Sequence, residues 1–159
     1  MPFATADICD EYKDKVQVLE ERMISYGGID SFCGEIVTVK LDDENSGLVS
    51  LLRDTKGDGR VVVVDVNKNY YAVVGDNLMK FALDNGWAGI IINGFVRDIK
   101  ITQTIAVGLF AIGTCPRKSF KNANSQLGID IEFGGVVFRE GEYIYADEDG
   151  VVVSTRNIH

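Results

Sequence analysis

The amino-acid sequence predicts a single α/β domain over residues 1–159, with a mixed, partly antiparallel sheet flanked by a few helices. Residues 61–66 and 88–93 are nearly continuous apolar runs, which are typical of parallel strands buried on both faces. A helical pattern at residues 76–85 separates them. Residues 129–154 carry short apolar runs divided by glycine-containing turns, which is typical of hairpins. A length of 159 residues favours one compact hydrophobic core.

The first third of the chain is predicted to form two helices and two strands. Thr5 can cap a helix at residues 6–12, with Asp7 near the positive end of its dipole. A strand is expected at 16–18, a loop at 25–28, a β-branched strand at 35–40, and a helix at 47–54 with Leu48, Leu51 and Leu52 facing inward.

The middle third alternates strands with helices. Residues 56–59 (KGDG) predict a turn before the strand at 61–66, and a second strand is expected at 70–74. The helix at 76–85 would turn Leu78, Phe81 and Ala82 inward and stop at Gly86. A buried strand at 88–93, a segment at 98–103 that fits either a helix or a loop, and a strand at 107–114 follow.

The last third is predicted to be mostly antiparallel. Residues 116–127 are polar and basic, as in a long surface loop. Gly134 and Gly135 interrupt an apolar segment at 129–138 and indicate a bulge or a close backbone approach. Short strands are expected at 143–146 and 151–154, separated by the turn at 147–150.

Composition excludes several classes of function. A net charge of −8 without a basic, aromatic patch disfavours direct nucleic-acid binding. The three cysteines (Cys9, Cys33 and Cys115) form no CxxC pair, and the only histidine is His159, so a zinc centre and a Ser-His-Asp mechanism are not expected. No apolar run has the length of a membrane span, and the N-terminus lacks a secretory signal. We therefore expect a cytoplasmic protein.

The stretch Gly75-Asp76-Asn77-Leu78 is the first candidate site. It follows a predicted strand and opens a predicted helix, so free backbone N–H groups and the helix dipole favour an anion there. Glycine lets a ligand approach the backbone closely. The alternative is purely structural, with Gly75 turning the chain and Asp76 capping the helix.

Arg97 and Asp98 are the second candidate. They come soon after the buried strand at 88–93, near its carboxyl end, where ligands usually bind in open α/β sheets. Arginine presents a fork for a carboxylate or a developing enolate, and aspartate suits Mg²⁺ or Mn²⁺. The alternative is an ordinary surface ion pair. Asp65, at the end of another buried strand, either supports the site or caps a turn.

The spacing D-x20-R-D between Asp76 and the pair Arg97-Asp98 resembles the signature of the RraA-like family. That family includes class II 4-hydroxy-4-methyl-2-oxoglutarate (HMG) aldolases and the regulator of ribonuclease E activity A. The resemblance extends along almost the whole chain, through the segments TADICDEY, GGIDSFCGEIVTVK, GRVVVVDV, GDNLM, GIIINGFVRD, IEFGGVVF and YADEDGVVVS.

The resemblance implies a swivelling β/β/α domain that assembles as a homotrimer, with active sites between neighbours. It implies that the backbone of Gly75, Asp76, Asn77 and Leu78 holds the carboxylate of a small 2-oxo acid. Arg97 would contact the keto oxygen, Asp98 would bind Mg²⁺ or Mn²⁺, and Asp76 would act through metal-bound water.

The implied activity is a carbon–carbon lyase. It would cleave HMG to two pyruvate and decarboxylate oxaloacetate through the same metal-stabilised pyruvate enolate. The alternative is a regulator that inhibits ribonuclease E by protein binding, without chemistry. A menaquinone methyltransferase is rejected because the sequence has no glycine-rich methyl-donor loop after a first strand.

One departure from the aldolase pattern concerns proton transfer. The aldolases tend to carry an acidic residue three positions after the aspartate of the Arg-Asp pair, and here that position is Ile101. Regulator-type members often lack that aspartate, whereas this chain keeps Asp98, which favours the enzyme.

Overall fold

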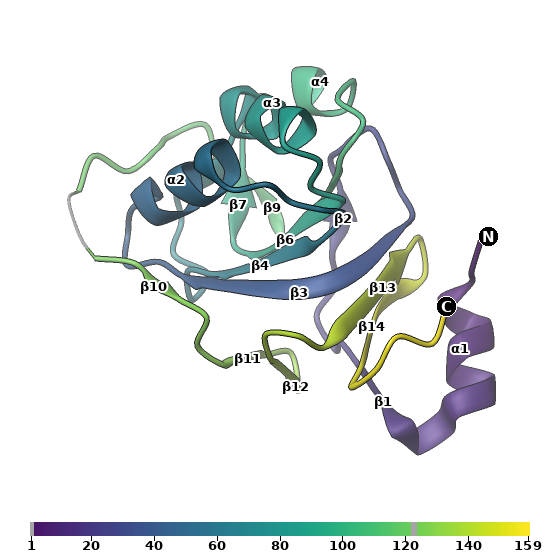
Figure 1. Cartoon of the computed structure of the whole chain (residues 1–159). Coiled ribbons are helices and arrows are strands. Elements are labelled where there is room, and N and C mark those ends of the chain that lie inside the picture. Colours follow the sequence, from purple (N-terminus) through teal and green to yellow (C-terminus); the bar gives the residue numbers. More distant parts are fainter. Residues whose placement is uncertain (1, 122–123) are drawn as a thin grey trace.

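A large mixed sheet forms the centre of the fold (Figure 1). The computed structural model describes residues 2–121 and 124–159. The strands of this sheet are β1 (Val16–Val18), β2 (Ile24–Ser25), β3 (Phe32–Lys40), β4 (Val61–Asp65), β6 (Gly89–Asn93), β8 (Gly108–Ala111), β10 (Gln126–Leu127), β13 (Tyr143–Asp147) and β14 (Gly150–Ser154). Their order is β1-β14-β13-β3-β4-β6-β8-β2, and β10 pairs with β3 beside this path.

Strand β3 joins the antiparallel and parallel parts of the sheet. Its first residues pair antiparallel with β13, for example Glu35 with Tyr143. Its later residues, from Ile36 to Lys40, pair in parallel with β4, and β6 and β8 extend that parallel region. The sheet is therefore mixed, as the sequence predicts.

Side chains on the two faces of the sheet enter two separate cores. Helices α2 (Ser46–Asp54), α3 (Asp76–Asp84) and α4 (Ile99–Thr102) lie over one face (Figure 1). The hairpin of β11 (Ile131–Phe133) and β12 (Val136–Phe138) packs on the other. In β4, Val62 and Val64 join the helix-side core and Val61 and Val63 join the hairpin-side core, which explains the continuous apolar run.

A smaller sheet of three parallel strands positions the candidate site. It consists of β5 (Ala72–Val74), β7 (Phe95–Val96) and β9 (Gly113–Thr114), in that order. These strands follow β4, β6 and β8 along the chain, so each of these central strands leads into a strand of the second sheet. Because β5, β7 and β9 are parallel, their carboxyl ends meet at one edge.

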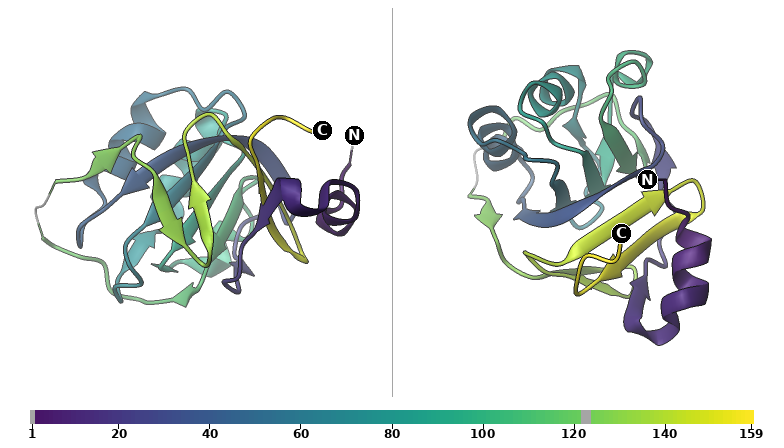
Figure 2. Two further views of the ribbon diagram at one scale, coloured as in Figure 1. Left: turned by 90° about the horizontal axis from the view of Figure 1, so that it is seen from below. Right: turned by 45° about the vertical axis from the view of Figure 1, so that its right-hand side comes forward.

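The N-terminal elements pack beside the β13–β14 hairpin (Figure 2). Helix α1 (Thr5–Tyr12) continues into a 3₁₀ turn, η1 (Lys13–Lys15). Ile8 of α1 is buried with Tyr145 and Val152 of the hairpin. The chain ends lie close together, and the rings of Phe3 and His159 are 5.5 Å apart.

Most predicted elements are present with ends shifted by a few residues. The helices predicted at 6–12, 47–54 and 76–85 correspond to α1, α2 and α3, and Leu48, Leu52 and Ala82 are buried as expected. Leu51 and Phe81 are partly buried against the same core, and Leu78 is buried. The ambiguous segment 98–103 contains α4. Part of the loop predicted at 116–127 lies outside the described residues.

Two structural predictions are wrong in detail, and one of the two alternatives for Gly134 and Gly135 is present. Thr5 does not cap α1, because Ala4 occupies that position and Thr5 instead donates from its N–H and hydroxyl groups to the Asp147 carboxylate, at 2.8 and 2.6 Å. Gly134 and Gly135 form no bulge, since they are the two-residue turn between β11 and β12, with φ of 56° and 75°. The expected close approach is present, because a Cβ on Gly134 would lie 2.5 Å from Leu19 Cδ1.

The second error is the single strand predicted at 107–114. It is two strands, β8 and β9, in different sheets. Between them the Ile112 N–H donates to the Gly94 carbonyl at 2.9 Å, where the chain passes from one sheet to the other.

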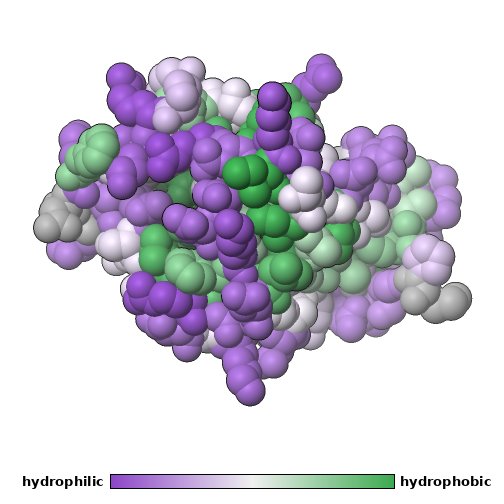
Figure 3. Space-filling view, turned by 90° about the horizontal axis from the view of Figure 1, so that it is seen from above, coloured by the Kyte–Doolittle hydropathy of each residue, from purple (hydrophilic) through white to green (hydrophobic). Residues whose placement is uncertain are grey.

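Hydrophilic side chains cover much of the face that carries the helices, and a hydrophobic patch lies near its middle (Figure 3). Leu83 on α3 and Ile101 on α4 are exposed apolar side chains. Over residues 2–121 and 124–159, none of the helices has the length and apolar character needed to cross a membrane.

Asp65 is a buried carboxylate whose acceptor positions are filled. Its Oδ2 accepts from Lys40 Nζ at 2.7 Å, and its Oδ1 accepts from the Asn67 N–H at 2.8 Å and Asn93 Nδ2 at 3.0 Å. Burial acts to raise the pKa of Asp65, but these three donors outweigh it and hold the pKa below its usual range. Asp65 therefore caps the turn at Asn67, one of its two predicted roles.

Asp65→Asn is expected to lower the free energy of unfolding at pH 7 by about 1–3 kcal/mol, because a charged acceptor of three hydrogen bonds is lost. A depressed pKa stabilises the fold above the unfolded-state value of about 3.9, and that contribution fades as pH falls through the folded-state pKa. The difference between variant and wild type should therefore shrink as pH falls below about 5 and continue to shrink as it passes through the folded-state pKa. Urea denaturation across that range measures it, with the exposed Asp84→Asn as control. A difference that is independent of pH would contradict the role of the charge.

Candidate active site

The two candidate stretches meet at the carboxyl edge of the β5-β7-β9 sheet. Gly75 follows β5 directly, and Arg97 follows β7. The sequence placed Arg97 and Asp98 near the end of the strand predicted at 88–93, but β7 intervenes. Gly94, between β6 and β7, allows the chain to pass close to Val66, because a Cβ there would lie 2.4 Å from Val66 Cγ2.

Gly75 is the N-terminal cap of α3. The first bond of the helix runs from the Met79 N–H to the Gly75 carbonyl at 3.2 Å, so the N–H groups of Asp76, Asn77 and Leu78 have no backbone acceptor within the helix, although the Asn77 N–H donates to the Asp76 carboxylate. Such groups attract an anion. The helix end therefore has the backbone arrangement that the predicted carboxylate cradle requires.

Asp98 lies over this cradle. The Asp76 N–H donates to Asp98 Oδ2 at 3.4 Å, and a Cβ on Gly75 would lie 2.6 Å from the same oxygen. The absence of a side chain at Gly75 thus makes room for a carboxylate at the helix end. The two stretches, about twenty residues apart, form one site.

Asp98 has a left-handed backbone conformation, with φ 61° and ψ 36°, at the start of α4. Its carbonyl accepts from the Ile101 and Thr102 N–H groups, both at 2.9 Å, which holds it in place. Such a conformation costs a non-glycine residue about 1 kcal/mol or more, and it turns the carboxylate towards the cradle.

Arg97 is held at its backbone and at its guanidinium. Its N–H donates to the Val74 carbonyl at 3.0 Å, and Nη1 donates to the Pro116 carbonyl at 3.3 Å. Its Nε is 3.9 Å from Asp98 Oδ2. Both side chains are a little over one-third exposed, so a small ligand can reach them.

Asp76 points to Lys80 one helical turn further on, at 3.5 Å. Burial acts to raise the pKa of Asp76, but the charge and hydrogen bond of Lys80, together with hydrogen bonds to Asp98 and the Asn77 N–H, outweigh it, so the pKa is lowered. Asp76 is therefore ionised at neutral pH. Ile101, at the position of the expected acidic residue, is 44% exposed on α4 and offers no proton acceptor.

A cavity of about 70 Å³ joins these residues. Asn45 and Lys118 also line it, and neither was a sequence candidate. Asn45 Nδ2 donates to the Val73 carbonyl at 3.1 Å, which attaches the start of α2 to β5. The cavity is lined by Asn45, Ala72, Val73, Gly75, Asp76, Asn77, Leu78, Arg97, Asp98 and Lys118.

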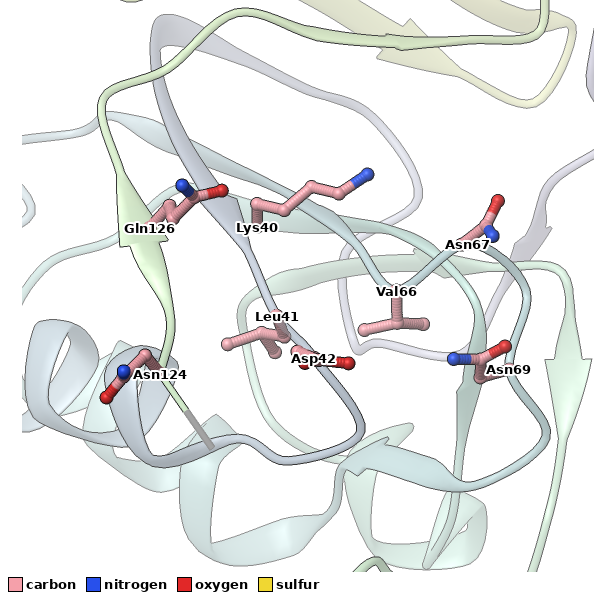
Figure 4. Close-up of a pocket in the computed structure, with 8 residues that line it drawn as sticks. All are labelled: Lys40, Leu41, Asp42, Val66, Asn67, Asn69, Asn124 and Gln126. Atoms are coloured by element: carbon pink, nitrogen blue, oxygen red, sulfur yellow. The ribbon is translucent and has the colours of Figure 1, made fainter. Parts of the chain in front are cut away.

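A larger hollow of about 430 Å³ lies elsewhere, at the carboxyl ends of β3 and β4 (Figure 4). Asn124 and Gln126 lie on one side of it and Asn67 and Asn69 on the other. Its lysine, Lys40, is paired with Asp65. We favour the smaller cavity as the reactive centre because an arginine, two carboxylates and the start of a helix converge there.

The residues at the cradle fit a divalent cation that is bound mainly by water and ligand oxygens. Within residues 2–121 and 124–159, no group of three or more His, Cys, Asp or Glu side chains gathers to hold a metal. Mg²⁺ usually takes only one or two protein carboxylates and keeps several waters. Asp98, with Asp76 nearby, could supply such a set.

The fold defines an α/β protein with a mixed sheet, and comparison with known sequences identifies the family. The model of the RraA-like family, described as Aldolase/RraA, matches residues 5–153. The chain belongs to this family.

Known relatives share the full length of the chain. A protein from Aromatoleum aromaticum named "Putative 4-hydroxy-4-methyl-2-oxoglutarate aldolase" is 43% identical over 159 residues, 99% of each chain. Two solved structures have the same fold. One, described as S-adenosylmethionine:2-dimethylmenaquinone methyltransferase from Geobacillus kaustophilus, is 40% identical, with a TM-score of 0.94 over 98% of this chain and 97% of that one. The other, the RNA-processing inhibitor RraA from Thermus thermophilis, is 29% identical, with a TM-score of 0.93 over 100% and 96%.

Proposed function

We propose that this protein is a divalent-metal-dependent carbon–carbon lyase that cleaves HMG into two pyruvate and decarboxylates oxaloacetate to pyruvate. The observation that carries the proposal is the convergence of Arg97 and Asp98 on the open helix end at Gly75. Relatives that are 43% identical over nearly the whole chain bear the name of an HMG aldolase, which supports it.

In this proposal the cradle binds the pyruvyl end of the substrate. The N–H groups of Asp76, Asn77 and Leu78 hold its carboxylate, as they would hold any anion at a helix start. The Arg97 guanidinium donates to the keto oxygen and stabilises the negative charge that develops there. A Mg²⁺ or Mn²⁺ ion held by Asp98 would add Lewis-acid polarisation of the 2-oxo acid.

Aldol cleavage also needs a proton acceptor. The proton leaves the C4 hydroxyl, the C3–C4 bond breaks, C4 becomes the carbonyl of one pyruvate, and the electron pair passes to the enolate of the other. That enolate then takes up a proton at the former C3 to give the second pyruvate. Asp98 is assigned to the metal and Ile101 supplies no acceptor, so we assign proton acceptance to Asp76, the other carboxylate that lines the cavity. Decarboxylation of oxaloacetate needs no such acceptor, and we expect it to tolerate loss of Asp76 better.

The test is pyruvate release by purified protein, followed by coupling to lactate dehydrogenase. With Mg²⁺ the protein should release pyruvate from HMG and from oxaloacetate, and EDTA should stop both reactions. A reaction without protein corrects for the spontaneous, metal-promoted loss of CO₂ from oxaloacetate. Pyruvate release that EDTA leaves unchanged would show that the reaction needs no metal. Absence of pyruvate release from both substrates would overturn the lyase.

A second candidate function is inhibition of ribonuclease E by protein binding, favoured by the likeness to RraA of Thermus thermophilis. An acidic protein with a net charge of −8 suits a basic partner. Arg97→Ala protein, with its chemistry removed, should then still inhibit ribonuclease E cleavage. Absence of inhibition by both wild type and variant would exclude this function.

A further inference from the structure

A basic pocket adjoins the candidate active site. It has a volume of about 420 Å³ and is lined by Asp43, Asn69, Tyr70, Tyr71, Arg117, Lys118, Ser119 and Lys121. Lys118 lines both this basic pocket and the 70 Å³ cavity over the cradle. The two spaces are therefore neighbours that share one lysine.

The backbone around Lys118 is anchored on both sides. The Ala72 N–H donates to the Arg117 carbonyl at 2.7 Å, which fixes the segment beside β5, the strand that leads into Gly75. On the other side, the Ser119 hydroxyl donates to the Asp43 carbonyl. Lys118 is thus placed at the cradle by the fold, although it lies in a loop that the sequence predicts to be surface-exposed.

The basic pocket has more positive than negative charge, in a chain whose net charge is −8. Asp43 is its carboxylate, and that group already accepts from Lys121 Nζ at 2.9 Å and Asn69 Nδ2 at 2.6 Å. In the described parts of the chain, Arg117 and Lys118 form no ion pair with a carboxylate. Arg117 Nη2 donates to the Tyr70 carbonyl at 3.5 Å, and Lys118 Nζ lies 5.1 Å from the centre of the Phe120 ring. Two cations are therefore available to an incoming anion.

The volumes of the cavity and of the basic pocket indicate which part of a ligand each one accepts. Sites that enclose a whole small ligand usually measure about 300–1,000 Å³. The 70 Å³ cavity is well below that range and accepts one end of a ligand, and the adjoining basic pocket, an open depression of about 420 Å³, has room for the other end.

We propose that the basic pocket is the subsite for the second carboxylate of a dicarboxylic 2-oxo acid, and that Lys118 is the residue that selects such substrates over monocarboxylic ones. The inference rests on the proposed function, which places the pyruvyl end at Gly75–Leu78. The substrate then runs from the cradle past Lys118 towards Arg117. A 2-oxo acid without a distal carboxylate binds at the cradle but gains no binding free energy from the basic pocket.

Binding of two unreactive ligands tests the subsite without requiring turnover. 2-Oxoglutarate and 2-oxopentanoate have the same chain length and the same pyruvyl end, and only the first has a distal carboxylate. Calorimetry with Mg²⁺ present should show that wild-type protein binds 2-oxoglutarate about ten-fold more tightly, the effect expected of one hydrogen bond to a charged group. Lys118→Gln should abolish this preference, Lys118→Arg should keep it, and Lys56→Gln, at an exposed lysine outside both pockets, should leave it unchanged.

The outcomes of this experiment test the proposed subsite separately from the proposed lyase activity. Equal affinity of wild type for the two ligands, or an equal loss for both in Lys118→Gln, would overturn the subsite even in a protein that releases pyruvate. A Lys118-dependent preference in a protein that releases no pyruvate would support the subsite and overturn the lyase. Failure to bind either ligand would overturn both.

Discussion

Asp98→Asn is expected to lower kcat/KM for pyruvate release from both HMG and oxaloacetate by about a thousand-fold or more. The amide keeps the shape of the side chain but loses the charge that would hold Mg²⁺ above the cradle. A bound metal contributes several kcal/mol to such a reaction, and each 1.36 kcal/mol is a factor of ten in rate. The loss should be accompanied by weaker binding of Mn²⁺, which electron paramagnetic resonance measures directly.

Comparison with Asp98→Ala separates chemistry from folding. Asparagine tolerates the left-handed conformation found at Asp98, whereas alanine is strained there. We therefore expect both variants to be inactive, but only Asp98→Ala to lower the melting temperature appreciably. Asp84→Ala, at the exposed end of α3, is the matched control. An Asp98→Asn protein that retained activity and Mn²⁺ affinity would exclude Asp98 as the metal ligand.

The sequence predicts the central part of the fold because its signals there are strong and local. Strands such as 61–66 are long, β-branched and apolar on both faces, and α3 has a clear apolar stripe that ends at Gly86. The three-stranded sheet could not be predicted. Its strands have two or three residues, too few to show a period, so the sequence predicts one strand where β8 and β9 lie.

The same distinction between local and distant signals applies to the site. Gly75 and Asp98 can be identified from the sequence because each follows a strand and has a chemical character that suits a ligand. Asn45 and Lys118 could not be identified from the sequence. They reach the cavity because hydrogen bonds attach their segments to β5, and these segments lie about thirty residues before β5 and over forty after it, respectively. In the sequence, Lys118 belongs to a polar, basic loop, and nothing local distinguishes it from a solvated lysine.

Arg97→Ala is expected to lower kcat by about a hundred- to a thousand-fold with a much smaller change in KM. Removing one donor from a preorganised oxyanion site usually costs that much. The effect should fall on kcat because the charge on the keto oxygen develops only as the carbon–carbon bond breaks, so the guanidinium binds the transition state more strongly than the substrate. Steady-state kinetics with HMG measures both constants, and Arg53→Ala on α2, distant from the cavity, is the control.

Arg97→Lys tests whether geometry matters in addition to charge. The guanidinium contacts the Pro116 carbonyl through Nη1 while its Nε faces Asp98, and a lysine ammonium cannot occupy both places. We therefore expect the lysine variant to recover only part of kcat, while binding of the substrate carboxylate, assigned to the backbone of Gly75–Leu78, stays nearly normal. A variant that raised KM and preserved kcat would instead place Arg97 on the ground-state carboxylate, and the roles of Arg97 and the helix end would have to be exchanged.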